Sequence, residues 1–255
     1  MTVVWITGGG SGIGRALALA YAQSSCEVVV SGRRMEALLE TQRLGGANIH
    51  PLRCDVTKNN DLQQAIEWIE ENFRRLDVVI ANAGYAQSGL LENLSMANWK
   101  RQMEVNLFGL VATVQYSLPL LEQSGGQVVL MSSVMAYVRF PKSGAYAASK
   151  AAVTAFGETL QLELHHSAVD CTIVHPGFIE SEIGQIDANG QYNPTLKDKR
   201  PSKLMWKADD AANVMKRAID KRKSHVTITG HGKIGEWFAR HAPRLLLWIQ
   251  SRFMV

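Results

Sequence analysis

The 255-residue chain is poor in cysteine and lacks a long apolar segment. Its three cysteines, Cys26, Cys54 and Cys171, form no CxxC pair and belong to no metal-ligand cluster, so the sequence predicts reduced, buried thiols and no metal. No apolar run reaches the ~18 residues of a membrane span, and no signal sequence precedes the first strand pattern. These absences favour a cytoplasmic protein of ordinary globular composition.

Charge is unevenly distributed along the chain. The formal net charge is +4, yet residues 191–255 hold 14 of the 27 Lys and Arg residues and 5 of the 23 acidic residues. Such a basic quarter could attract nucleic acid or anionic lipid. Because no nucleic-acid-binding motif interleaves its aromatic and basic residues, we expect no nucleic acid partner. A solvated face or an anionic-ligand field is favoured over a membrane surface.

Short apolar runs alternate with helical periodicity. Most of the runs are rich in Val, Ile and Leu, which is typical of parallel strands covered on both faces. The predicted strands are Val3–Ile6, Glu27–Val30, Ile49–Arg53, Val78–Ala81, Gln127–Met131, Thr172–Val174 and Val226–Ile228. The predicted helices are Ile13–Gln23, Met35–Leu44, Asn60–Phe73, Ala97–Leu121, Tyr146–His165 and Ala208–Lys221. This alternation predicts an α/β fold: a single-domain, Rossmann-like, doubly wound parallel sheet of about seven strands over residues 1–230, with helices on both faces.

Two segments depart from the alternation. Residues 182–206 are polar and interrupted by Gly and Pro, so we expect a substrate loop that covers a ligand cleft after the sixth strand. Residues 231–255 form a basic and apolar tail, in which Trp237 to Ile249 are accompanied by Arg240, Arg244 and Arg252. This tail either makes weak contact with a membrane surface or packs on its own domain or a neighbouring subunit, and packing is favoured.

A glycine-rich turn links the first strand to the first helix. Its sequence is Thr7-Gly8-Gly9-Gly10-Ser11-Gly12-Ile13-Gly14. A strand, such a turn and a helix bring a pyrophosphate onto the helix N-terminus, and glycine allows close backbone approach. The spacing is TGxxxGxG and not GxGxxG, so a tight turn without a ligand is the alternative. The pattern predicts dinucleotide binding by Gly8, Gly10, Ser11, Gly12, Ile13 and Gly14.

Two arginines follow the second strand. An NAD site places Asp or Glu about 20 residues past the glycine motif, where it binds the ribose 2′-hydroxyl. This chain has Arg33 and Arg34 there, just before a predicted helix start, where the helix dipole disfavours cations. A 2′-phosphate would reverse that penalty through charge-assisted hydrogen bonds. The pair therefore favours NADP(H), with two solvent-facing arginines as the alternative.

The third and fourth strands end in polar or small residues. Asp55, followed by Val56, could accept a hydrogen bond from an adenine amino group or could equally initiate a turn. Asn82, Ala83 and Gly84 put small residues where the backbone could pass close to a cofactor ribose. The stronger signal is their convergence. The following residues lie at or just after the carboxyl ends of strands, which form one ligand-binding edge in an open parallel sheet: Gly8, Arg33, Asp55, Asn82, Ser133 and Pro176.

Tyr146 and Lys150 are spaced i and i+4, so they share one face of a predicted helix. A phenol has a reference pKa of about 10, and a nearby ammonium lowers that pKa. The pair therefore predicts a general acid/base. Ser133 closes the fifth strand and could hold a substrate oxygen. Asn106, within a predicted long helix, is either a satisfied core amide or part of a water-linked proton path.

With these residues assembled, the chain resembles the short-chain dehydrogenase/reductase family from about Thr2 to about Ile228. The TGxxxGIG motif of the family is matched from Thr7 to Gly14, and its NAG motif from Asn82 to Gly84. Its active-site quartet corresponds to Asn106, Ser133, Tyr146 and Lys150.

The segment after the sixth strand also resembles the family. The PG motif is matched by Pro176 and Gly177, and the resemblance adds Ile179 and Ser181 to the cofactor-binding residues. Ser181 stands where the family usually has Thr, and the hydroxyl is kept. Ala81 stands where the family usually has a second asparagine before Ala-Gly.

The resemblance implies an NADP(H)-dependent oxidoreductase acting on a carbonyl/secondary alcohol pair. Tyr146 would protonate the substrate oxygen and Ser133 would orient it. Lys150 would hold the nicotinamide ribose and lower the tyrosine pKa, and Asn106 would anchor a water of the proton relay. The family is commonly a homodimer or homotetramer through the helices that correspond to Ala97–Leu121 and Tyr146–His165.

The substrate and two other functions stay open at this stage. Candidate pocket residues suggest a largely apolar small molecule: Tyr85, Met135, Tyr137, Phe140 and Phe178. A non-catalytic NADPH-binding sensor or scaffold is the main alternative, disfavoured because all four active-site positions are filled. A nucleotide-sugar epimerase or dehydratase shares YxxxK but resembles a longer chain with different glycine spacing.

Overall fold

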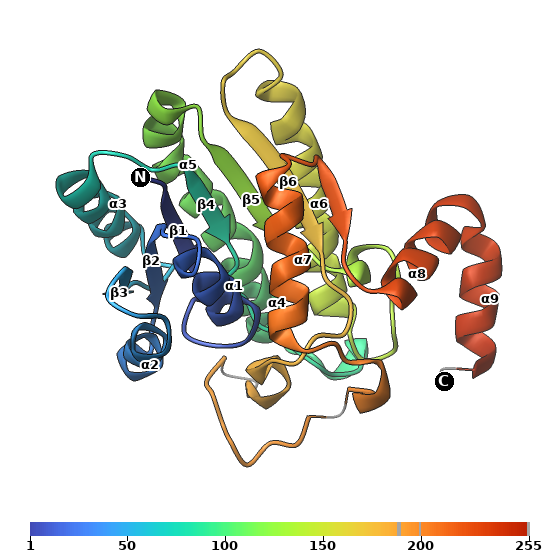
Figure 1. The fold of residues 1–255 in the computed structure, drawn as a ribbon. Helices are drawn as coiled ribbons and strands as arrows, with labels where there is room; N and C mark the ends of the chain where they lie inside the picture. Colours follow the sequence, from blue (N-terminus) through green and yellow to red (C-terminus); the bar gives the residue numbers. More distant parts are fainter. Residues whose placement is uncertain (188–189, 199, 254–255) are drawn as a thin grey trace.

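Seven apolar runs form the strands of one parallel sheet (Figure 1). The computed structural model describes residues 1–187, 190–198 and 200–253. The strand order is β3-β2-β1-β4-β5-β6-β7, so the chain winds outward in both directions from the centre of the sheet. The strands are β1 (Val3–Thr7), β2 (Glu27–Gly32), β3 (Ile49–Arg53), β4 (Val78–Ala81), β5 (Gln127–Met131), β6 (Asp170–His175) and β7 (His225–Thr227). The predicted doubly wound α/β sheet is confirmed.

Helices cover both faces of the sheet. They are α1 (Gly12–Ala22), α2 (Met35–Gly45), α3 (Asn59–Phe73), α4 (Met96–Met103), α5 (Gly109–Ser124), α6 (Gly144–Glu163) and α7 (Ala208–Asp220). Successive strand residues point to opposite faces. Val3 and Trp5 accordingly pack in a core with α3, α5 and α6, whereas Val4 and Ile6 pack with α1, α2 and α7. Ligands can therefore reach the sheet at its strand ends.

The helix predicted over Ala97–Leu121 is interrupted. After α4, a π-helical turn spans Glu104–Phe108, and α5 begins at Gly109. Asn106 lies in this turn and is fully buried. Gly109 lies against Val56, and a Cβ there would be 2.6 Å from Val56 Cγ2. The prediction of one continuous helix is wrong at this turn, because apolar periodicity does not reveal a single wider turn; such turns are frequent at functional sites.

The predicted substrate loop, residues 182–206, has little regular structure in its described residues. Short 3₁₀ turns occur at Glu182–Gln185 and Ser202–Leu204, and Ile186 bridges to Tyr192. A further bridge joins Ile179 to Trp206 and closes the base of the segment. Figure 1 shows the loop at the lower side of the molecule, in gold to orange.

The C-terminal tail is helical in its described part. α8 (Gly230–His241) starts two residues after β7, and α9 (Pro243–Phe253) packs against α8. Pro243 is the first residue of α9, a position where the missing N–H costs nothing. Figure 1 shows this hairpin extending outward beyond the β6–β7 edge of the sheet. Among the described residues, no helix is both long and apolar enough to cross a membrane.

Candidate active site

The parallel strands bring the predicted site residues to one edge of the sheet. The turns after β1 to β6 all leave at the carboxyl end of their strands. They carry the six residues that the sequence predicts there: Gly8, Arg33, Asp55, Asn82, Ser133 and Pro176. Residues up to 168 positions apart in the chain are thereby assembled along one edge.

The glycine-rich turn is packed too tightly for side chains. Gly8 has a φ of +68°, and a Cβ there would lie 2.9 Å from Ala83 Cα. A Cβ on Gly14 would lie 2.3 Å from the Gly8 carbonyl oxygen. Asn82 Nδ2 donates to the Thr7 carbonyl at 2.9 Å and to the Gly8 carbonyl at 3.3 Å. The asparagine thus fixes the turn to the end of β4.

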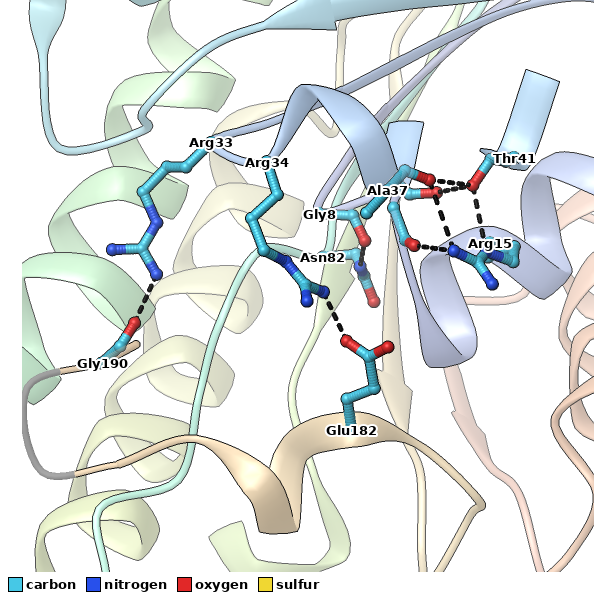
Figure 2. A network of polar contacts seen from close by, with 11 residues as sticks. Gly8, Arg15, Arg33, Arg34, Ala37, Thr41, Asn82, Glu182 and Gly190 are labelled. Atoms are coloured by element: carbon cyan, nitrogen blue, oxygen red, sulfur yellow. Dashed lines mark hydrogen bonds and ion pairs between the residues drawn. The ribbon is translucent and has the colours of Figure 1, made fainter. Parts of the chain in front are cut away.

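Arg15 and Thr41 donate hydrogen bonds to the same turn, as Figure 2 shows. Arg15 donates from Nη2 to the Gly10 carbonyl and from Nε to Thr41 Oγ1 at 3.1 Å. Thr41 Oγ1 donates to the Gly9 carbonyl at 3.0 Å. Neither residue can be predicted from the sequence, because a helical Arg and Thr carry no motif that distinguishes them from surface residues.

The start of α1 has the features of a phosphate site. Ser11 is the N-cap residue, but its side chain makes no capping hydrogen bond. The first N–H groups of a helix have no partner within the helix and favour an anion. Ile13 lies within this first turn, and Ser181 lies against Gly12, where a Cβ would be 2.7 Å from Ser181 Cβ. These residues fit a dinucleotide pyrophosphate.

Arg33 and Arg34 already have protein partners in the substrate loop (Figure 2). Arg33 Nη2 donates to the Gly190 carbonyl at 2.5 Å. Arg34 forms an ion pair with Glu182, and its guanidinium lies 4.6 Å from the ring centroid of Tyr192. Both arginines are nevertheless exposed, as the alternative of a solvent-facing pair expects. Their contacts connect the turn after β2 with the loop after β6.

Two basic cavities flank Arg33. One of about 570 Å³ is also lined by Asp55, Tyr85, Lys100 and Arg101, among others. The other, of about 440 Å³, is lined by Arg33, Asp55, Arg53, Lys58, Asp61 and Gln64. Each cavity is lined by three cations, Arg33 among them, and by two carboxylates, so the charge at the end of β2 and β3 is mixed with a small positive excess. The volume suffices for a nucleotide portion of a cofactor.

Asp55 initiates a turn, one of the two roles that the sequence left open. Its Oδ1 accepts from the backbone N of Thr57 at 3.1 Å and from Thr57 Oγ1 at 2.8 Å. Its own backbone N donates to Asp61 Oδ2 at 2.9 Å. The carboxylate nevertheless borders both cavities beside Arg33.

Ser133 and Tyr146 meet at the end of β5. Ser133 is the second residue after the strand, and its hydroxyl lies close enough to the Tyr146 phenol to lower the pKa of that phenol. Ser133 Oγ also lies 3.4 Å from the Pro176 carbonyl, to which it donates. The backbone N of Val134 donates to the same carbonyl at 3.0 Å, so the PG motif fixes the serine. The two hydroxyls that the sequence predicts to work together are adjacent.

Lys150 lies one helical turn from Tyr146. Its Nζ is 5.8 Å from the centre of the tyrosine ring and donates to the Met131 carbonyl at 2.7 Å. The lysine side chain is buried. This carbonyl keeps the ammonium between α6 and the end of β5, beside Ser133 and Tyr146.

Burial shifts both ionisable groups of the pair. It raises the pKa of Tyr146 above its usual 10.0, while the hydrogen bond with Ser133 and the positive charge of Arg200 act in the opposite direction. The predicted lowering of the tyrosine pKa is therefore not found, because desolvation of the phenolate dominates. Burial also lowers the pKa of Lys150 to about 8.

Asn106 is held by the segment after β4. Its Nδ2 donates to the Tyr85 carbonyl and to Ser149 Oγ, at 3.0 and 3.1 Å, and its Oδ1 accepts from the Tyr85 N at 3.0 Å. A Cβ on Gly84 would lie 3.1 Å from Asn106 Oδ1 and 3.6 Å from Lys150 Nζ. The amide is hydrogen-bonded in the core, as one interpretation of the sequence expects, and it also adjoins the site. Its part in a water-linked proton path stays a prediction.

Arg200 fastens the loop that carries the last predicted residues. It donates from Nη1 to the Ile179 carbonyl at 2.8 Å and from Nη2 to the Ser181 carbonyl at 2.9 Å, and it pairs with Asp198. Arg200 cannot be predicted from the sequence, since it lies in a polar loop without a motif. Gly177 lies against Thr229 and His231, so the start of α8 also supports this loop.

Comparison with known proteins agrees with this geometry. A family model described as short chain dehydrogenase matches residues 2–190. The chain is 34% identical over 257 residues to 11-beta-hydroxysteroid dehydrogenase 1A of Arabidopsis thaliana, covering 96% of this chain and 73% of the relative. It is 32% identical over 199 residues to an uncharacterized oxidoreductase of Staphylococcus aureus, covering 77% of this chain and 84% of the relative.

Solved structures of similar fold hold nicotinamide cofactors. A short chain dehydrogenase/reductase of Burkholderia phymatum in complex with NAD has a TM-score of 0.79 at 27% identity, covering 89% of this chain and 88% of that one. An alcohol dehydrogenase of Thermococcus sibiricus complexed with 5-hydroxy-NADP has a TM-score of 0.77 at 26% identity, covering 90% and 96%. This chain belongs to the short-chain dehydrogenase/reductase family of oxidoreductases.

Proposed function

We propose that this protein is an NADP(H)-dependent oxidoreductase that interconverts an apolar carbonyl compound and its secondary alcohol, with Tyr146 as general acid/base. The observation that carries the proposal is the proximity of the Ser133 hydroxyl to the Tyr146 phenol, whose pKa it lowers, with Lys150 one helical turn away. Two hydroxyls and an ammonium at the carboxyl edge of the sheet form a site for a polarised oxygen.

The residues of this edge fit a nicotinamide dinucleotide. The glycine turn and the uncapped start of α1 would hold its pyrophosphate, and Asn82 to Gly84, Pro176, Gly177, Ile179 and Ser181 would border its nicotinamide half. When bound, the cofactor would supply or accept the hydride. The protein residues supply binding, orientation and proton transfer.

Tyr146 supplies the proton in the direction of reduction. Because burial raises its pKa, the phenol is protonated at neutral pH. It can therefore donate to a substrate oxygen as negative charge develops there, and Ser133 can donate a second hydrogen bond that fixes this oxygen. In oxidation, the same residues act in reverse, with Tyr146 accepting the proton.

Lys150 and Asn106 support the tyrosine. With a pKa of about 8, Lys150 is mostly charged at pH 7, and its ammonium would hold the nicotinamide ribose and stabilise a developing phenolate. Asn106 fixes the backbone of Tyr85 and the hydroxyl of Ser149, and would position a water that returns a proton to the site.

The preference for NADP(H) rests on Arg33 and Arg34. Arg33 lines both cavities, and Arg53 and Lys58 add positive charge to the second. Arg34 lies against the loop after β6, where it pairs with Glu182. A 2′-phosphate carries more negative charge than a hydroxyl and matches the guanidinium fork.

The substrate class rests on the aromatic side chains beside the PG motif. Phe140 and Phe178 lie with ring centroids 6.2 Å apart, next to the Ser133 segment and the start of α8. Such a lining favours an apolar substrate. Relatives named hydroxysteroid dehydrogenases agree with a bulky apolar secondary alcohol or ketone as the substrate class.

Assembly and location complete the proposal. The helices through which the family commonly dimerises expose large apolar side chains here, Phe108 after α4 and Leu162 on α6, which would be covered in a homodimer or homotetramer. The three free, buried cysteines suit the reducing cytoplasm.

A panel of apolar ketones and secondary alcohols, assayed by the change in nicotinamide absorbance with NADPH/NADP⁺ and with NADH/NAD⁺, tests the function. We expect turnover with at least one ketone and a higher kcat/KM with NADPH than with NADH. Tight NADPH binding without turnover of any compound would favour the non-catalytic sensor or scaffold instead.

A further inference from the structure

The α8–α9 hairpin attaches to the body of the protein by its inner side. Arg240 donates to the Tyr137 hydroxyl at 2.9 Å, and Gln250 donates to the Arg139 carbonyl at 2.5 Å. Gly235 of α8 lies against Val138, where a Cβ would be 2.9 Å from Val138 Cγ2. Packing on its own domain, one of the two expectations for the tail, therefore occurs, but it uses one side of the hairpin.

The outer side of the hairpin exposes large apolar side chains. On α9 the covered positions are Leu246, Ile249 and Gln250, and the positions between them face solvent. The exposed large apolar residues of the hairpin, with exposed fractions of 46 to 62%, are Ile234, Trp237, Leu245, Leu247 and Trp248. Five such side chains on two short helices exceed what a surface helix of a globular protein normally leaves in water.

The same surface is basic. Residues 230–253 contain four Lys and Arg residues and a single acidic residue, Glu236. Glu236 forms an ion pair with Arg240. Exposed Lys233, Arg244 and Arg252 therefore give the outer side a net positive charge. We call the five apolar side chains together with these three cations the docking surface.

The charge decides between a second copy of the chain and a lipid surface. A symmetric contact between two copies would press each docking surface against an identical one, so the cations would face one another. An anionic bilayer interface accepts the apolar side chains and also attracts the cations. Trp side chains are moreover enriched at the membrane–water interface.

We propose that the α8–α9 hairpin docks this protein on anionic lipid surfaces, with both helices lying in the plane of the interface. At 12 and 11 residues the two helices are too short to span a bilayer and suit an interfacial position. The proposal concerns binding and does not depend on catalysis.

Docking would bring the substrate side of the protein close to the lipid. The backbone N of Phe178 donates to His231 of α8 at 3.3 Å, and α8 also packs against the 3₁₀ turn Val134–Ala136 that follows Ser133. An apolar substrate dissolved in the bilayer would then have a short path to the site. This last step rests on the proposed function.

Vesicle binding of the full-length protein tests the proposal. We expect co-sedimentation with vesicles containing about 30 mol% phosphatidylglycerol, little with pure phosphatidylcholine, and a decrease as salt rises from about 0.1 to about 0.5 M. The double variant Trp237→Ser/Trp248→Ser should lose at least about tenfold in partition coefficient. Arg244→Glu/Arg252→Glu should lose a similar factor on the anionic vesicles alone.

Matched variants on other surfaces separate docking from general effects. Leu39→Ser/Leu44→Ser removes two exposed leucines from α2, and Lys203→Glu/Lys221→Glu reverses two exposed lysines. Both should bind vesicles like the wild type, and thermal melts should show that every variant is folded. Absence of vesicle binding by the wild type, or equal losses in the hairpin and control variants, would overturn the proposal. The proposal would also be overturned if the wild type were a dimer that becomes monomeric in Trp237→Ser/Trp248→Ser while vesicle binding stays unchanged.

Turnover distinguishes this proposal from the proposed function. The hairpin variants should keep the kcat of the wild type on a water-soluble ketone, because they lie on the outer side of the helices. Vesicle binding without turnover would support lipid docking and contradict the proposed oxidoreductase activity. Turnover without vesicle binding would support the activity and contradict docking.

Discussion

Arg34 and Glu182, 148 positions apart in the chain, form an ion pair that ties the turn after β2 to the loop after β6 (Figure 2). Arg34 is one of the two residues predicted to bind the 2′-phosphate of NADP(H). Because carboxylate and phosphate repel each other, Glu182 and a 2′-phosphate compete for the same guanidinium. If Arg34 binds the 2′-phosphate as we propose, the pair opposes cofactor binding at the nucleotide end.

Removing this carboxylate charge should tighten binding of ligands that carry a 2′-phosphate. The Arg34 and Glu182 side chains are 40% and 30% exposed, and exposed pairs are worth up to about 1 kcal/mol. We expect Glu182→Gln to bind 2′,5′-ADP about two- to fivefold more tightly and to bind ADP unchanged, as measured by titration calorimetry.

Two further variants control this measurement. Glu180→Gln, two residues away in the chain, should leave both affinities unchanged. In the Arg33→Ala/Arg34→Ala background, the preference for 2′,5′-ADP over ADP and for NADPH over NADH should narrow, and Glu182→Gln should have no further effect. If Glu182→Gln acts equally with and without the arginines, the competition does not occur.

A second prediction concerns the glycine turn. Gly14→Ala would place a Cβ 2.3 Å from the Gly8 carbonyl oxygen and 2.6 Å from Asn82 Nδ2, neither of which can move without disturbing the turn. Overpacking of this kind costs about 1 to 3 kcal/mol. We expect a loss of that size in the free energy of unfolding in urea, together with weaker binding of 2′,5′-ADP.

Gly230 provides the matched control. It is the first residue of α8, and a Cβ there would meet nothing within 4 Å. Gly230→Ala should leave both the free energy of unfolding and the 2′,5′-ADP affinity nearly unchanged. Equal behaviour of Gly14→Ala and Gly230→Ala would mean that close packing at Gly14 does not shape the turn.

A third prediction tests the proton donor. Tyr146→Phe keeps the ring and removes the hydroxyl that Ser133 contacts, so we expect turnover to fall by ~10²-fold or more. The affinity for 2′,5′-ADP should stay that of the wild type, since this ligand lacks the nicotinamide half. Tyr116→Phe on α5 serves as the control. Wild-type turnover in Tyr146→Phe would exclude the phenol as the proton donor.

Local sequence patterns predict the sheet well and the helical connections less well. The strands predicted at Ile49–Arg53, Val78–Ala81 and Gln127–Met131 have the bounds found in the structure. For the last two the reason is that buried parallel strands are nearly continuous apolar runs flanked by polar residues. The turn at Glu104–Phe108 was not predicted, since its width depends on contacts of Asn106 with Tyr85 and Ser149, which lie far away in sequence. The regular helices α8 and α9 were likewise not predicted in the tail.

The candidate site shows the same division. Residues in motifs, such as Gly14, Ser133 and Tyr146, could be predicted because their spacing reflects the backbone geometry that they need. Arg15 and Arg200 could not, since each acts by donating to backbone carbonyls, which no side-chain motif marks in the sequence. The effect of burial on the Tyr146 pKa could not be predicted either, because the sequence does not show how completely the phenol is desolvated.

The last prediction concerns the buried charge of Lys150. Its pKa of about 8 lies below the ordinary value of 10.5, because burial disfavours the ammonium. Between pH 8 and 10.5 the unfolded chain binds a proton that the native state has lost, so native stability rises with pH in this window, and below pH 8 the cost of burial is complete. Lys150→Met has no such group, so its stability relative to wild type should be highest below pH 8 and should fall by up to about 3 kcal/mol towards pH 10.5.

Urea unfolding of both proteins at pH 7 and pH 10 measures this difference, with the exposed Lys221→Met as the control, whose difference from wild type should stay constant. A pH-independent difference for Lys150→Met would show that the lysine keeps an ordinary pKa in the folded protein, and that its ammonium is not desolvated beside Tyr146.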